Sequence, residues 1–414
     1  MEILSLYITL AFSATYVSRK VLKIQDLIFF IHFFVGFFII LSAQLWVVLG
    51  LPNTNNWILF SHAEIRFFSI SVYLYYIFGV CLLYFLFTRL NISLPSIPFS
   101  CASGVRHNEK YDILIFIFVA VFINFISDLF GYFAPYVSSI ANFALVAALC
   151  LCSRYFSIKF LIFLVVFVSI TIFVGQALFE GAVNRGGVIK AASAIIVFKF
   201  FSRREPLRPV MTSLTIVLGG ALLLSSAQVS ELIFSGQQAD ISLMISFFLR
   251  ALELRNIENL AYLLWSLDMS SVSFWGFTQI YNVFVEVVFP FANSQSSSSS
   301  ILQNMINSQF NVENNNAGYG FGLVAEGFMI SGLWSVLFIS CLSAIILRFI
   351  TVLLDSNSAL FRILGSYLFP LSVYMYRADL LYISKVLIFS LISFFLILYV
   401  RCFMHRILNP LGAK

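Results

Sequence analysis

The chain has 414 residues, of which 61% are hydrophobic and only 10% are charged, and its formal net charge is +6. A soluble domain is about 45–50% apolar and about 25% charged, so this composition excludes a water-soluble fold. The basic excess does not indicate a nucleic-acid partner, because membrane proteins collect Lys and Arg on their cytoplasmic loops.

Apolar runs long enough to cross a bilayer as helices recur along the whole chain. They do not alternate polar and apolar residues as membrane-spanning strands do. We therefore predict an all-α, polytopic integral membrane protein with about 11 transmembrane helices and a single membrane domain over residues 1–414. The predicted spans are 2–17, 27–50, 67–88, 113–130, 137–152, 160–179, 187–202, 210–229, 321–347, 360–376 and 384–400.

The loops between these spans differ in charge. Most of the 24 basic residues fall in one of the two alternating sets of loops, which the positive-inside rule assigns to the cytoplasm. The N-terminus is then outside and the C-terminus inside. Residues 231–320, between spans 8 and 9, form one large outer loop in which acidic residues outnumber basic ones.

This outer loop is expected to be partly helical. Residues 241–267 have a helical pattern, in which Arg250 and Glu253 are spaced i,i+3, as are Arg255 and Glu258. Surface ion pairing is the simpler explanation for both arginines, and ligand binding is the alternative. The Ser-rich and Asn-rich stretches that follow, "NSQSSSSSILQN" and "NVENNNAG", indicate water-facing segments.

Two arginines lie near the outer ends of spans. Arg185 precedes two glycines and opens a predicted helix, where open N–H groups and the guanidinium together suit a phosphate. The alternative is an arginine that reaches lipid headgroups, which is also the expected role of Arg66. Arg377 has Asp379 two residues on, so a structural ion pair and a ligand contact are both open.

Glu326 lies in "GYGFGLVAEGFMISG", where glycines lead from the loop into span 9. It falls about four residues into the helix, roughly 6 Å along the axis, where it meets the positive end of the helix dipole. We expect it to face an outer cavity, as a base, a hydrogen-bond acceptor or an arginine partner. Gly327 and Gly332 are expected to let helices approach closely.

No metal or disulfide site is expected. The four histidines are scattered, and none lies at metal-ligand spacing. The six cysteines form no CxxC pair and are expected as small core residues. We therefore predict a chemistry that uses no metal and no cofactor.

These features together resemble the O-antigen polysaccharide polymerases, the Wzy family. The resemblance rests on the Gly318–Gly332 segment, on many spans with one large outer loop, and on the segments "VNRGG" and "YRAD" that flank this loop. The motifs cover about thirty residues in a family of diverged sequences. The family's loop often ends in a Trp-Pro stretch, where this chain has Phe289-Pro290.

The resemblance implies a glycosyltransferase in the bacterial inner membrane that joins oligosaccharide repeat units carried on undecaprenyl pyrophosphate. The loop would be periplasmic, and a flippase and a chain-length regulator would be protein partners, with no nucleic acid. Expected catalytic residues are Glu326, Arg185 and Arg377, and expected substrate-binding residues are Arg250, Arg255, Glu253, Tyr319 and Asp379. The arginines would stabilise the pyrophosphate leaving group. The carboxylates of Glu326, Glu253 and Asp379 are the candidates for the base or hydrogen-bond acceptor that the acceptor hydroxyl needs.

Two alternatives remain open. An O-antigen ligase uses the same donor, but it usually has a histidine in the large outer loop, and residues 231–320 contain none. A lipid-linked oligosaccharide flippase or other transporter would tend to show internal repeats and polar sites at mid-membrane, which this sequence lacks.

Overall fold

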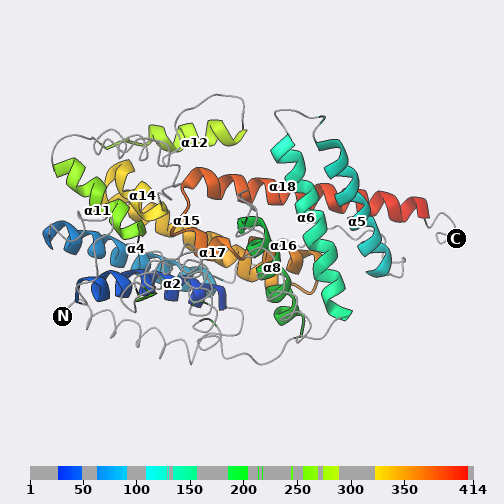
Figure 1. The fold of residues 1–414 in the computed structure, drawn as a ribbon, viewed down its shortest axis with the longest axis horizontal. Helices are drawn as coiled ribbons and strands as arrows, with labels where there is room; N and C mark the ends of the chain where they lie inside the picture. The colour runs from blue at the N-terminus through cyan, green and yellow to red at the C-terminus, as the bar shows by residue number, and fades with distance from the viewer. Residues whose placement is uncertain are drawn as a thin grey trace, which may run out of the picture. The chain divides into compact units, whose positions relative to one another are not determined.

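The computed structural model describes residues 27–48, 63–90, 109–127, 129, 134–155, 185–203, 213, 217, 244–245, 255–268, 274–288 and 322–408. Within these ranges all regular structure is helical, which confirms the predicted class (Figure 1). Five helices in this part of the chain are long and apolar enough to cross a membrane: Leu27–Leu45, Ala63–Arg89, Val137–Tyr155, Leu333–Asp355 and Leu380–Met404. The protein is therefore a helical membrane protein.

The helices divide between two compact units. The first unit contains α2 (Leu27–Val48), α4 (Ala63–Arg89), α11 (Arg255–Asp268), α12 (Thr278–Val288), α14 (Leu323–Ser331), most of α15 (Leu333–Asp355), α17 (Leu371–Tyr374) and the first turn of α18 (Leu380–Leu408). The second contains α5 (Glu109–Ser127), α6 (Ala134–Cys152), η3 (Ser153–Tyr155), α8 (Arg185–Arg203), α16 (Ala359–Leu368) and the remaining parts of α15 and α18. The single membrane domain over residues 1–414 stays a prediction.

The first unit is held together by aromatic and small residues. The ring of Phe29 on α2 stacks on that of Tyr84 on α4, with centroids 4.6 Å apart. A Cβ added to Gly79 would lie 2.9 Å from Ser340, so the missing side chain lets α4 approach α15 closely. The Ser340 hydroxyl donates to the carbonyl of Tyr76 at 3.2 Å. In Figure 1, α2 and α4 run side by side.

The predicted ninth span, 321–347, is broken in the structure. The chain turns at Gly332, which has φ 67° and ψ −145°, and α15 begins one residue later and continues to Asp355. Gly327 makes the expected close approach, since a Cβ there would lie 2.9 Å from Ile339. Gly332 does not, because a Cβ there would meet nothing within 4 Å. Its role is to allow the turn.

The predicted tenth span, 360–376, is broken as well. Helix α16 ends at Leu368, a turn at Phe369 and Pro370 follows, and α17 runs only from Leu371 to Tyr374. Proline lacks an N–H, so it cannot continue the hydrogen-bond ladder of the helix before it. Spans 27–50, 67–88, 113–130, 137–152, 187–202 and 384–400 correspond to α2, α4, α5, α6, α8 and α18. Spans 2–17 and 160–179, and nearly all of 210–229, lie outside the described residues.

Two polar contacts join helices within the second unit. Arg401 binds Asp112 through two hydrogen bonds, of 2.7 and 2.9 Å. The Lys199 ammonium donates to the carbonyl of Ser153.

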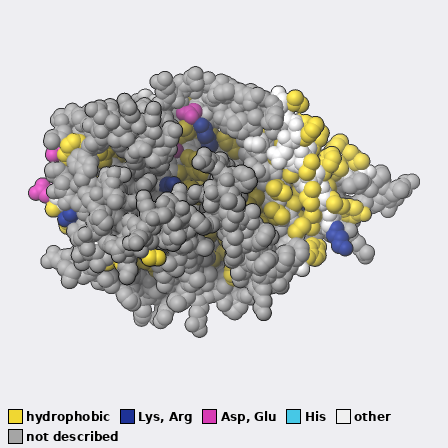
Figure 2. All heavy atoms as spheres, in the orientation of Figure 1, with side chains coloured by type: hydrophobic (Ala, Val, Ile, Leu, Met, Phe, Trp, Pro, Cys, Tyr) yellow, Lys and Arg dark blue, Asp and Glu magenta, His cyan; other side chains and the backbone are white. Residues whose placement is uncertain are grey.

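The second unit exposes large apolar side chains on α5, and also on α6 and α18. Leu114, Phe118, Phe122 and Phe125 are exposed at helical spacing. Figure 2 shows hydrophobic side chains covering this part of the surface, as expected for a helix that faces lipid.

One sequence-based expectation about cysteine is wrong. Cys402 is disulfide-bonded, although no disulfide was expected. Among the cysteines in the described part of the chain, Cys81, Cys150, Cys152 and Cys341 are free thiols within or beside apolar helices.

Candidate functional site

The glycine-rich segment and the "YRAD" segment, about fifty residues apart in sequence, are bound to each other in the first unit. The Gly322 N–H donates to the carbonyl of Arg377 at 3.3 Å, and the Leu323 N–H donates to that of Met375 at 3.2 Å. Gly322 has φ 72°, a conformation that glycine adopts without strain. Two of the three motif segments of the sequence analysis therefore form one structural element, which we call the arginine junction (residues 322–326 and 375–380).

Glu326 closes the arginine junction. Its Oε2 accepts the backbone N–H of Leu380 at 2.5 Å, and its side chain is fully buried. The expectation that Glu326 faces an outer cavity is therefore wrong. Because Leu380 is the first residue of α18, the carboxylate meets the positive end of that helix as well as that of its own.

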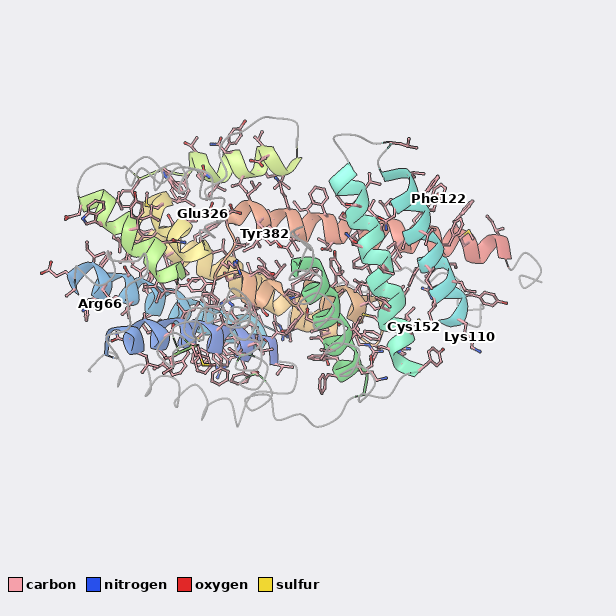
Figure 3. All side chains as sticks on the ribbon, in the orientation of Figure 1. Arg66, Lys110, Phe122, Cys152, Glu326 and Tyr382 are labelled. Carbon is pink, nitrogen blue, oxygen red and sulfur yellow. The ribbon has the colours of Figure 1, made fainter. Side chains whose placement is uncertain are left out.

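A second carboxylate binds the same helix end. Asp379 Oδ1 accepts the N–H of Tyr382 at 2.8 Å, the usual contact of a helix-capping aspartate. Asp379 is 6% exposed, whereas Arg377, two residues earlier, is exposed. Figure 3 labels Glu326 on α14 and Tyr382 in the first turn of α18, the helix whose first residue binds Glu326. The backbone that carries Arg377 is thus fixed at both ends, while its side chain reaches the surface.

Residues from the large loop pack on α14. The N–H groups of Trp275 and Gly276 donate to the carbonyls of Met329 and Ile330 at 2.9 and 3.0 Å. The Phe328 ring contacts Phe274 and also Phe68 of α4. Residues 274–276 of the loop are therefore bound to the helix that carries Glu326.

The other predicted site residues are less well placed. Arg185 is the first residue of α8, which confirms that it opens a helix. Helix α8 belongs to the second unit, and the structure does not describe the Arg185 side chain. Arg255 is the first residue of α11, and its side chain also lies outside that structure. Arg250, Glu253 and Tyr319 lie outside the described residues.

His32 is a residue that the sequence analysis set aside. It is buried on α2 and bonds to Ser372, which is 340 positions away in the chain and five residues before Arg377. The sequence offered one signal for this contact, which was a histidine inside a span that has no Lys, Arg, Asp or Glu.

Comparison with models of protein families, with characterised proteins and with solved structures gives no match for this chain.

Proposed function

We propose that this chain is an O-antigen polymerase, a glycosyltransferase of the bacterial inner membrane that lengthens a surface polysaccharide on the periplasmic face. The proposal starts from the resemblance of residues 318–332, 183–187 and 376–379 to that family. Its substrates would be oligosaccharide repeat units on undecaprenyl pyrophosphate, delivered by a flippase, and a chain-length regulator would set the product size.

The arginine junction is the observation that carries the proposal. It supports an exposed guanidinium on a backbone fixed by the bonds of Gly322, Leu323 and Glu326. An arginine on a fixed backbone at the surface of a membrane protein suits a pyrophosphate, because arginine can bind phosphate oxygens through two N–H groups at once. Fixing the backbone beforehand also avoids reorganisation when charge develops on the leaving group.

The reaction transfers the growing glycan from its lipid carrier to a new repeat unit. A hydroxyl oxygen of the acceptor unit forms a bond to the anomeric carbon of the donor glycan. The bond from that carbon to the pyrophosphate oxygen breaks, and undecaprenyl pyrophosphate leaves with the bonding electron pair. Arg377, with Arg185 as the second candidate, would stabilise the negative charge that develops on this group.

An acidic residue would receive the hydroxyl proton. Glu326 is fully buried against Leu380, so we assign it to supporting the arginine junction. Glu253 is the first candidate for hydrogen bonding to the acceptor hydroxyl, and Asp379 is the second, because Asp379 is nearly buried and its Oδ1 already caps α18. The large loop, with Arg250, Arg255 and Tyr319, would order the sugars and keep water from competing as acceptor.

Deletion of the gene in its host tests this proposal. A gel of the surface polysaccharide should then show lipid A-core carrying a single repeat unit. Loss of all repeat units from the core would instead indicate a ligase, or a flippase if lipid-linked units also accumulate inside the cell. A full-length ladder in the deletion strain would contradict all three functions.

Complementation of that strain tests the arginines. Variants Arg377→Ala and Arg185→Ala should fail to restore the ladder at normal protein level. Arg66→Ala should restore it, because Arg66 lies in the first turn of α4 and is assigned to lipid headgroups (Figure 3). Full ladders from both Arg377→Ala and Arg185→Ala would contradict the proposed anion site.

A further inference from the structure

A buried polar cluster joins four helices of the first unit. His32 Nδ1 of α2 donates to the carbonyl of Ser372 on α17 at 2.7 Å. His32 Nε2 lies 3.3 Å from the hydroxyl of Tyr76 on α4, and this hydroxyl donates to Ser343 Oγ on α15 at 2.8 Å. His32 is 1% exposed and Tyr76 is fully buried. We call these residues the His32 cluster.

The bond to Ser372 fixes the tautomer of His32. A carbonyl oxygen can only accept a hydrogen bond, so Nδ1 must carry a proton. In the neutral ring Nε2 is then an acceptor, and it lies 3.3 Å from the Tyr76 hydroxyl, whose proton is directed to Ser343 Oγ. His32 therefore binds α17 by donating the Nδ1 proton to the Ser372 carbonyl.

The same imidazole packs against the residue before Arg377. The rings of His32 and Tyr376 are stacked, with centroids 4.5 Å apart and planes inclined by 24°. The Tyr376 hydroxyl fills the space beside Gly36, where an added Cβ would lie closer to it than any normal contact. One face of the Ser372–Arg377 segment is thus held by α2, whereas the bonds from Gly322 and Leu323 hold its backbone from α14.

We propose that His32 is a positioning residue for Arg377, acting through the Ser372 carbonyl and the Tyr376 ring. The role rests on the proposed function, because it concerns how the pyrophosphate-binding arginine is held. Displacement of a catalytic group by about 1 Å can cost about 100-fold in rate, so loss of this contact should lower kcat more than it raises KM. His32 itself touches no substrate in this account.

Two amide variants separate donation from Nδ1 from any other role of the ring. The amide nitrogen of asparagine occupies nearly the position of Nδ1, and that of glutamine nearly the position of Nε2. With purified protein and undecaprenyl-pyrophosphate-linked repeat units, His32→Asn should keep kcat within about threefold of the unsubstituted protein. His32→Gln should lower it by about 10- to 100-fold at little-changed KM.

Ser42→Ala is the matched control. It removes another buried side-chain bond of α2, from Ser42 Oγ to the carbonyl of Ile39 in the same helix, and should leave kcat unchanged. Equal kcat for His32→Asn and His32→Gln would refute the role of His32, as would a Gln variant that changes only KM. If the unsubstituted protein does not lengthen the repeat units, the proposed function fails instead.

Discussion

Glu326 is buried, and its carboxylate contacts a helix other than its own. Its bond to the Leu380 N–H satisfies a donor that the first turn of α18 would otherwise leave open. Two helix dipoles also favour a negative charge at this point, since Glu326 lies in the first turn of α14 and Leu380 begins α18. These interactions explain how a carboxylate is tolerated in an otherwise apolar segment.

Replacing Glu326 should therefore affect stability according to what the new side chain can accept. Glu326→Ala leaves the buried N–H of Leu380 without its acceptor, which costs about 1–3 kcal/mol. Glu326→Gln keeps an acceptor oxygen and should lose clearly less. Unfolding of the purified protein in detergent micelles measures both changes.

Glu64 provides the control for this comparison. It is an exposed acid in the first turn of α4, so Glu64→Ala should change stability by at most about 0.5 kcal/mol. Equal losses for Glu326→Ala and Glu326→Gln would show that the bond to Leu380 is not what the carboxylate provides.

For single residues, the sequence identified Glu326 and Arg377 as candidates. It did not predict that the segments that carry them are bound to each other. Glycines before an acid predicted an important turn into the membrane, and Gly322 has the positive φ that such a turn requires. Burial of Glu326 could not be predicted, because its partner is 54 positions away. The same reason hid the contact of His32 with Ser372.

At the scale of elements, the break at Gly332 separates α14 from the membrane-crossing α15. Its φ of 67° and ψ of −145° lie in a region that residues with a side chain rarely adopt. Hydropathy cannot detect such a break, because both sides of it are apolar. The break after α16 could have been predicted from Pro370. The apolar run on both sides of this proline favoured a continuous span instead.

Gly332 and Gly327 should respond differently to alanine. Gly332→Ala should destabilise by about 1–3 kcal/mol through backbone strain alone, since no neighbour lies within 4 Å of the new Cβ. Gly327→Ala should destabilise through a clash with Ile339, whose Cγ1 would lie 2.9 Å away. Unfolding in micelles again measures both.

Truncation of Ile339 provides the distinguishing control. In an Ile339→Ala background, Gly327→Ala should cost less than it does alone, while the cost of Gly332→Ala should be unchanged. Rescue of Gly332→Ala by this truncation would mean that its effect is steric, contrary to the account given above.

For the whole molecule, two observations disagree about which compartment the end of α18 near Arg401 faces. The basic residues assign the side that carries Lys110, Arg154 and Arg401 to the cytoplasm. Cys402, next to Arg401, is disulfide-bonded, and structural disulfides are rare on the cytosolic side. We give more weight to the charge bias, because it is summed over many loops.

Reporter fusions decide between the two assignments. Green fluorescent protein fused after Lys414 should fluoresce, and alkaline phosphatase fused there should be inactive, because we predict a cytoplasmic C-terminus. Phosphatase activity without fluorescence would show that the C-terminus lies outside the cytoplasm, opposite to the predicted topology. The arginine junction would then face the cytoplasm, contrary to the proposed reaction.

The central claim is that the arginine junction serves the lengthening of a lipid-linked glycan, and one measurement tests it most directly. Purified protein in liposomes is given undecaprenyl-pyrophosphate-linked repeat units, and the lengths of the lipid-linked products are followed. We predict a ladder of products together with released undecaprenyl pyrophosphate, and loss of both in Arg377→Ala at equal protein level and equal melting temperature. Movement of unlengthened units across the bilayer, or an unchanged ladder from Arg377→Ala, would contradict the account.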